Sequence, residues 1–174
     1  CRKMKRELAV LWVRNLLGMW LMCALLACSM PLVPPYDRAV SEALNAANTE
    51  TMTLFASINP SVQKYDFATR SERYAQVIGK LDALALSANA RPVPKNPTVD
   101  KLNAALDKLI PASANADDVR IPSVFAIRKI SEAITKMRDA DMKQGLTAYE
   151  VIAFKQEVSI YFDQALTYEN FLQR

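Results

Sequence analysis

The chain of 174 residues has no histidine. Histidine is the side chain that most often acts as a general base near neutral pH, and it is also the most common metal ligand. All three cysteines lie at or before position 28, so the longer part of the chain that follows has no thiol. That part therefore has no disulfide, no thiolate metal site and no cysteine nucleophile. We expect no catalytic residues, no metal and no cofactor.

Glycine is also scarce, because the chain has three glycines against nine prolines. A sheet protein with many tight turns needs more glycine, whereas proline separates helices. No segment alternates polar and apolar residues with a period of two, and no internal repeat is evident. The composition therefore predicts an all-α protein.

Net positive charge is confined to one end of the chain. The formal net charge is +4, and residues 1–27 carry five basic side chains and one acidic side chain. The other 147 residues hold 17 basic and 17 acidic side chains and are formally neutral. Nucleic-acid binding needs a surplus of Lys and Arg on one face. We therefore expect no nucleic-acid partner.

The first 27 residues are organised like a secretory signal peptide. Lys5 and Arg6 form a basic start, and an apolar run of 11 residues occupies positions 16–26. A membrane-spanning helix needs about 20 apolar residues, and extending the run backwards would place Arg14 inside it. The pattern predicts a signal peptide over residues 1–27, with an uncleaved signal anchor as the alternative.

The residues Leu25-Leu26-Ala27-Cys28 resemble the lipobox of bacterial lipoproteins. Ala27 matches the small residue at the cleavage site and Leu25 matches the aliphatic residue, whereas Leu26 is less typical. The resemblance implies that a peptidase cleaves before Cys28, which then carries a diacylglycerol and a fatty acid such as palmitate. Ser29 replaces the aspartate that retains enteric lipoproteins in the inner membrane. It therefore implies the outer membrane, with the inner membrane as the alternative.

The chain beyond the lipobox divides into a tether and a helical domain. Residues 28–36 contain Pro31, Pro34 and Pro35, which disfavour helix and give a short, semi-extended tether. In residues 37–174, apolar residues recur every three or four positions, as on the buried side of a helix. This predicts an antiparallel bundle of four long helices and one short helix. The expected helices span residues 37–59, 69–91, 97–110, 122–144 and 147–174.

Local signals mark the ends of these helices. Thr69 with Glu72, and Thr147 with Glu150, have the spacing of a capping box. Gly145 is expected to stop the fourth helix. Gly79 is unfavourable inside the second helix, and we expect it to mark close contact with a neighbouring element.

Two pairs of carboxylates are candidates for acid–base chemistry, Asp117-Asp118 and Asp139/Asp141. The first pair precedes a helix, where acids interact favourably with the helix dipole. The second pair is expected on the polar face of a helix, with Asp139 paired to Lys143 four residues later. Neither pair predicts catalysis.

Aromatic residues concentrate on the last helix. Core packing is the simplest role for them, but large aromatic side chains also dominate protein–protein interfaces. The sharper hypothesis is that part of this set stays exposed and binds a partner. The set comprises Tyr149, Tyr161, Phe162, Tyr168 and Phe171.

Together these features predict a lipid-anchored, periplasm-facing protein that binds or scaffolds other envelope proteins and has no catalytic activity. Its partners are then the membrane, through the lipid on Cys28, and a protein of the envelope. One alternative is a carrier that holds an apolar ligand in a cavity between its helices. The other is an enzyme that uses carboxylates and tyrosine, which requires a pocket lined by Asp or Glu.

Overall fold

The apolar periodicity of the sequence is realised as long helices. The computed structural model describes residues 33–92 and 121–174, and most of these residues are helical. The prediction of a mainly helical protein is therefore confirmed for this part of the chain. The helix expected at 97–110, the signal peptide and the start of the tether lie outside the described residues. The long helices are α2 (Arg38–Ile58), α3 (Ser71–Asn89), α5 (Pro122–Gln144) and α6 (Ala148–Leu172).

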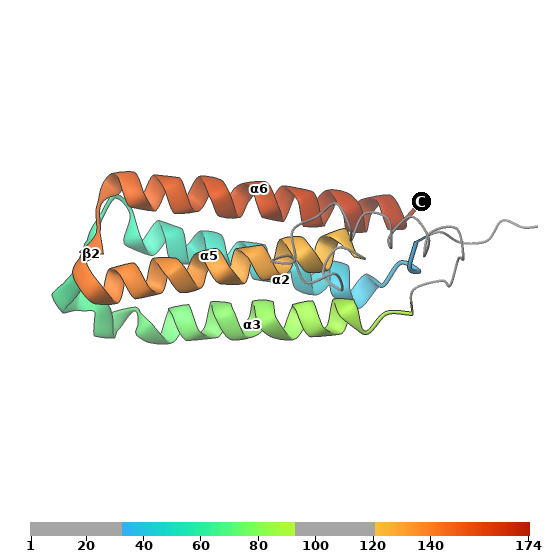
Figure 1. Cartoon of the computed structure of the whole chain (residues 1–174), viewed down its shortest axis with the longest axis horizontal. Helices are drawn as coiled ribbons and strands as arrows, with labels where there is room; N and C mark the ends of the chain where they lie inside the picture. Colours follow the sequence, from blue (N-terminus) through green and yellow to red (C-terminus); the bar gives the residue numbers. More distant parts are fainter. Residues whose placement is uncertain (1–32, 93–120) are drawn as a thin grey trace, which may run out of the picture. The chain divides into compact units, whose positions relative to one another are not determined.

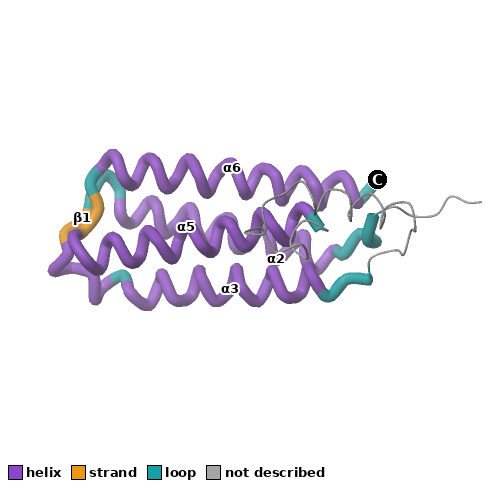
Figure 2. Tube along the Cα trace, in the orientation of Figure 1, coloured by secondary structure: helices purple, strands orange, loops and turns teal. Residues whose placement is uncertain are grey.

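The long helices lie side by side along their length (Figures 1 and 2). α5 packs against α3 and α6, and α2 packs against the same two helices. Neighbouring helices run in opposite directions, as Figure 1 shows. The helices belong to one compact unit, Leu32–Arg174.

One apolar stripe on each helix faces the common core, as the spacing predicts. On α5 the stripe is completely buried, since none of its five members is exposed by more than 1%. Burial of each such side chain contributes about 1.5–3 kcal/mol, which makes these stripes the main source of stability. The α5 stripe comprises Val124, Ile127, Ile130, Ile134 and Met137.

Two very short strands pair the segment that connects α2 to α3 with the segment that connects α5 to α6. β1 (Val62–Gln63) follows α2, β2 (Gly145–Leu146) follows α5, and the two strands are antiparallel. The 3₁₀ helix η1 (Lys64–Thr69) leads from β1 into α3. The sequence did not predict these strands, because two residues are too few to reveal alternation.

The two predicted capping boxes have different outcomes. The box at the start of α6 is confirmed, because Thr147 N–H donates to Glu150 at 2.9 Å and Glu150 N–H donates to Thr147 Oγ1 at 3.3 Å. The box at the start of α3 is wrong. Thr69 Oγ1 donates instead to the carbonyl of Asp66 at 2.7 Å, within η1. The N-cap of α3 is Arg70, whose side chain makes no capping hydrogen bond.

Gly79 does not mark a close contact. It lies in the exposed part of α3, and a Cβ atom added there would meet no atom within 4 Å. The expectation of close packing is therefore wrong. A side chain at position 79 would project into open space.

We predict that Gly79→Ala stabilises the protein by about 0.5–1 kcal/mol. Glycine loses more backbone entropy than alanine when a helix forms, and the added methyl group meets no steric obstacle. Urea unfolding followed by circular dichroism measures this change. A lower free energy of unfolding in the variant would contradict the prediction.

Candidate functional site

A buried ion pair joins the start of α3 to the end of α5. Asp141 is completely buried and accepts hydrogen bonds from Arg70 Nη2 at 2.8 Å and Arg70 Nε at 3.0 Å. Tyr74 Oη donates a third hydrogen bond to the same carboxylate at 3.1 Å. Arg70 also donates to the backbone carbonyls of Gln63 and Asp66. We call Arg70, Tyr74 and Asp141 the Asp141 cluster.

The predicted position of Asp141 on a polar face is wrong. Its carboxylate lies near the N-terminus of α3. There its negative charge interacts favourably with the positive charge of Arg70 and with the positive end of the helix dipole. The neighbouring Asp139 does stay at the surface, but it accepts from Arg138 at 2.8 Å and not from Lys143. With three side-chain donor atoms on it, Asp141 serves as a structural anion and does not support a catalytic role. The Asp117-Asp118 pair lies outside the described residues.

A second buried ion pair ties the end of α3 to the end of α6. Arg91 donates to both oxygens of Glu169, at 2.7 and 2.8 Å, and Glu169 is completely buried. The same guanidinium donates to Ser123 Oγ at 3.2 Å and to the carbonyl of Ala88 at 3.1 Å. Three helices therefore meet at Arg91, and each end of α3 carries an arginine paired to another helix.

Sequence reasoning missed both buried carboxylates, although a signal was present. Asp141 follows Met137 by four residues on the α5 stripe, and Glu169 follows Ala165 by four residues on the α6 stripe. A charged residue on an apolar stripe indicates a buried ion pair when a partner exists. The partners are 71 and 78 residues away in the sequence, so the pattern of one helix does not identify them.

The Asp141 cluster also affects the ionisation of Tyr74. Burial raises the pKa of Tyr74, the negative charge of Asp141 and their hydrogen bond raise it further, and Arg70 lowers it. An unfolded tyrosine has a pKa of about 10. The folded state therefore keeps the proton at a pH where the unfolded state loses it. This contribution to stability is fully present below pH about 10 and is lost as the pH rises above that value.

We predict that Tyr74→Phe weakens the alkaline loss of stability. Between pH 10 and 11, the wild-type free energy of unfolding should fall by about 1 kcal/mol more than that of the variant. At pH 8 the variant should be less stable by about 1 kcal/mol, because one hydrogen bond to Asp141 is lost. Unfolding curves at these pH values test both points, and equal alkaline losses would contradict the assignment.

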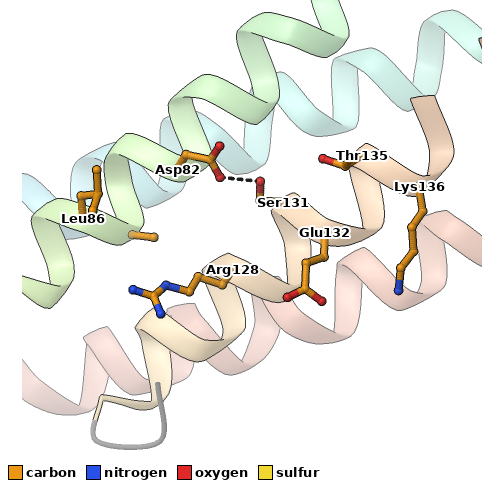
Figure 3. Close-up of a pocket in the computed structure, with 8 residues that line it drawn as sticks. Asp82, Leu86, Arg128, Ser131, Glu132, Thr135 and Lys136 are labelled. Carbon is orange, nitrogen blue, oxygen red and sulfur yellow. Dashed lines mark hydrogen bonds between the residues drawn. The ribbon is translucent and has the colours of Figure 1, made fainter. Parts of the chain in front are cut away.

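A groove of about 590 Å³ lies on the surface between α3 and α5. Figure 3 shows Asp82 on α3 and Ser131 on α5 facing each other across it, and Ser131 Oγ donates to Asp82 at 2.6 Å. Leu86, which is 68% exposed, stands on the α3 side. The groove is lined mostly by apolar atoms, with charged groups on its α5 side. Its lining residues are Asp82, Ala85, Leu86, Arg128, Ser131, Glu132, Thr135 and Lys136.

Two polar side chains that line this groove, Ser131 and Glu132, have partners within the chain. Ser131 donates to a carboxylate, but activation of a serine nucleophile requires a stronger base such as histidine, and the chain has none. Glu132 forms an ion pair with Lys129 at 2.7 Å. Lys136, by contrast, makes no ion pair within the described ranges. The groove therefore combines an apolar surface with the cation of Lys136, which no described acidic residue pairs with.

The structure separates the five aromatic residues predicted to bind a partner. Phe162 is 2% exposed and lies in the core, so the hypothesis is wrong for this residue. Tyr161 and Tyr168 are half-buried, and Tyr161 packs edge-on against Phe125. Tyr149 and Phe171 are 80% and 59% exposed, but they lie near opposite ends of α6. The set therefore does not form one patch.

The residues of the predicted lipid anchor lie outside the described part of the chain. These are Leu25, Leu26, Ala27, Cys28 and Ser29. Among residues 33–92 and 121–174, no helix has the length and hydropathy needed to cross a membrane. The same residues contain no group of three or more Asp, Glu, Cys or His side chains placed to hold a metal ion.

Comparison with protein-family models, with curated proteins and with solved structures gives no match for this chain.

Proposed function

We propose that the protein is a lipid-anchored binding module of the bacterial cell envelope, with no catalytic activity. Lipid on Cys28 holds it to the periplasmic face of the outer membrane, and residues 28–36 tether an antiparallel helical bundle. The bundle recruits an envelope protein through the groove between α3 and α5. The lipobox-like sequence supports the anchor, and the groove supports the binding role.

The partner segment that fits this groove is an amphipathic helix. Its apolar face packs on Ala85 and Leu86, and an acidic side chain meets the cation of Lys136. A helix in a groove between two other helices is a common mode of peptide recognition. The exposed leucine is the observation that carries this proposal, because it offers apolar area that the chain itself leaves open.

Photo-crosslinking in native membranes tests the groove. A photoreactive amino acid at position 86 should yield a protein adduct, whereas the same amino acid at Tyr65, which is 82% exposed in η1, should not. Lys136→Glu should reduce the adduct at position 86 several-fold, and Lys64→Glu, the same charge change in η1, should leave it unchanged. An adduct that does not depend on Lys136, or no adduct at position 86, would overturn the groove proposal.

The two alternative functions receive less support from the described residues. A carrier of an apolar ligand needs space between the helices, but large side chains such as Phe55, Tyr74 and Met137 are less than 2% exposed and fill the core. A carboxylate enzyme needs an accessible acid without a partner, but in the groove Asp82 accepts from Ser131 and Glu132 is paired with Lys129. The buried acids Asp141 and Glu169 are each paired with an arginine. A surface binding role uses the exposed Leu86 and the cation of Lys136, and neither alternative requires them.

A further inference from the structure

α6 exposes several large apolar side chains on its outer side in addition to those that it buries in the core. Val158 and Phe162 face the core, while Tyr149, Ile152 and Ile160 are between 53% and 80% exposed. Exposed large apolar side chains that gather on one face, next to polar residues, are typical of a contact surface. The outer side of α6 therefore has the composition of a contact surface.

A shallow hollow lies on this outer side. Its volume is about 510 Å³, and every residue that lines it belongs to α6. Both exposed isoleucines contribute to its walls, next to one basic residue. The lining residues are Ile152, Lys155, Gln156, Ser159 and Ile160.

The residues around the hollow are arranged symmetrically about Ser159. Lys155 precedes Ser159 by four residues, and Asp163 follows it by four. Ile152 precedes it by seven residues, and the half-buried Leu166 follows it by seven. Steps of four and seven residues correspond to about one and two helical turns, so all five residues share one side of α6.

The two charged members of this pattern have no partner of their own. Lys155 and Asp163 are both exposed, and neither forms an ion pair within residues 33–92 and 121–174. They are eight residues apart, which is too far for them to pair within one helix. Each has a charge that a suitably placed second helix would complement.

We propose that the outer side of α6 binds a second copy of this chain in an antiparallel arrangement, with the two-fold axis at Ser159. In a two-fold interface, residue i of each copy meets residue j of the other. Reversal of α6 about Ser159 brings each Lys155 level with Asp163 of the second copy, and each Ile152 level with Leu166. The small side chain of Ser159 allows the two helices to approach closely at the axis.

The charges also determine the direction of the second helix. A parallel pair would place Lys155 against Lys155 and Asp163 against Asp163, and like charges in contact disfavour association. The antiparallel pair replaces both repulsions with attractions. This dimer uses α6 and does not require the groove between α3 and α5.

A charge swap tests the proposed dimer. In the full chain purified in detergent, sedimentation equilibrium should give a dimer of the wild type. Lys155→Asp and Asp163→Lys should each raise the dissociation constant at least about tenfold, because each change introduces two repulsions into the symmetric interface. The combined swap should restore it to near the wild-type value. Lys64→Asp, an equal charge change in η1, is the matched control and should have no effect.

Disulfide trapping provides a second measurement. Ser159→Cys places a thiol at the axis and should give a covalent dimer on mild oxidation, above the background of the wild-type cysteines. Thr167→Cys, which lies two turns from the axis, should not. A monomeric wild type, or a combined charge swap that fails to restore association, would overturn the proposal.

Discussion

Asp141→Ala should lower the free energy of unfolding by about 3–5 kcal/mol, which is the usual effect of removing one partner from a buried ion pair. Arg70 is 7% exposed, and the substitution leaves its guanidinium with backbone carbonyls as its remaining partners among the described residues. It also leaves Tyr74 Oη without its acceptor. Urea unfolding of the full chain, followed by the helical circular dichroism signal, measures the loss.

Asp139→Ala is the matched control for this prediction. Asp139 is two residues away on the same helix, but it is exposed, and within residues 33–92 and 121–174 its partner is the neighbouring Arg138. Exposed ion pairs contribute about 0–1 kcal/mol, so this variant should unfold almost like the wild type. Equal losses of stability in the two variants would contradict the prediction, because they would show that removal of Asp141 does not leave a buried charge on Arg70 without its partner.

Gly145→Ala should destabilise the protein by at least about 2 kcal/mol. The φ angle of Gly145 is +81°, a conformation that residues with a side chain rarely adopt. A Cβ atom would also lie 2.5 Å from the carbonyl oxygen of Val62 and 2.9 Å from the amide nitrogen of Lys64. The added methyl group therefore pushes β1 away from β2.

Gly79→Ala is the matched control for Gly145→Ala. The same chemical change should stabilise the protein at position 79 and destabilise it at position 145, since only the second site combines a positive φ with backbone atoms at close range. Thermal unfolding of the two variants should give shifts of opposite sign. A stabilising effect of Gly145→Ala would contradict the described contact between the two helix connections.

The helices were predictable because their signals are local. The α5 stripe from Val124 to Met137 was evident from spacing alone, and Pro122 and Gly145 marked the ends of that helix as expected. The Thr147–Glu150 box is another feature within one turn. The Thr69–Glu72 box failed because a tertiary interaction took precedence. Arg70 occupies the cap position, and its side chain is directed to Asp141.

The features that involve distant residues were not predictable. The two buried ion pairs and the pairing of β1 with β2 each join segments far apart in the sequence, and a periodic pattern carries no information about which segments meet. The groove has the same origin, because Leu86 and Lys136 lie on different helices. The aromatic hypothesis erred at Phe162 because aromatic content alone does not distinguish the inner from the outer side of α6.

Metabolic labelling with a fatty-acid precursor tests the lipid anchor, the central claim of the proposed function, most directly. The wild-type chain should incorporate the label and lose its first 27 residues. Cys28→Ala should remain unlabelled and uncleaved, while Cys23→Ala, a matched change within the apolar run, should be labelled and processed normally. Labelling or normal processing of the Cys28→Ala chain would contradict the anchor at this residue.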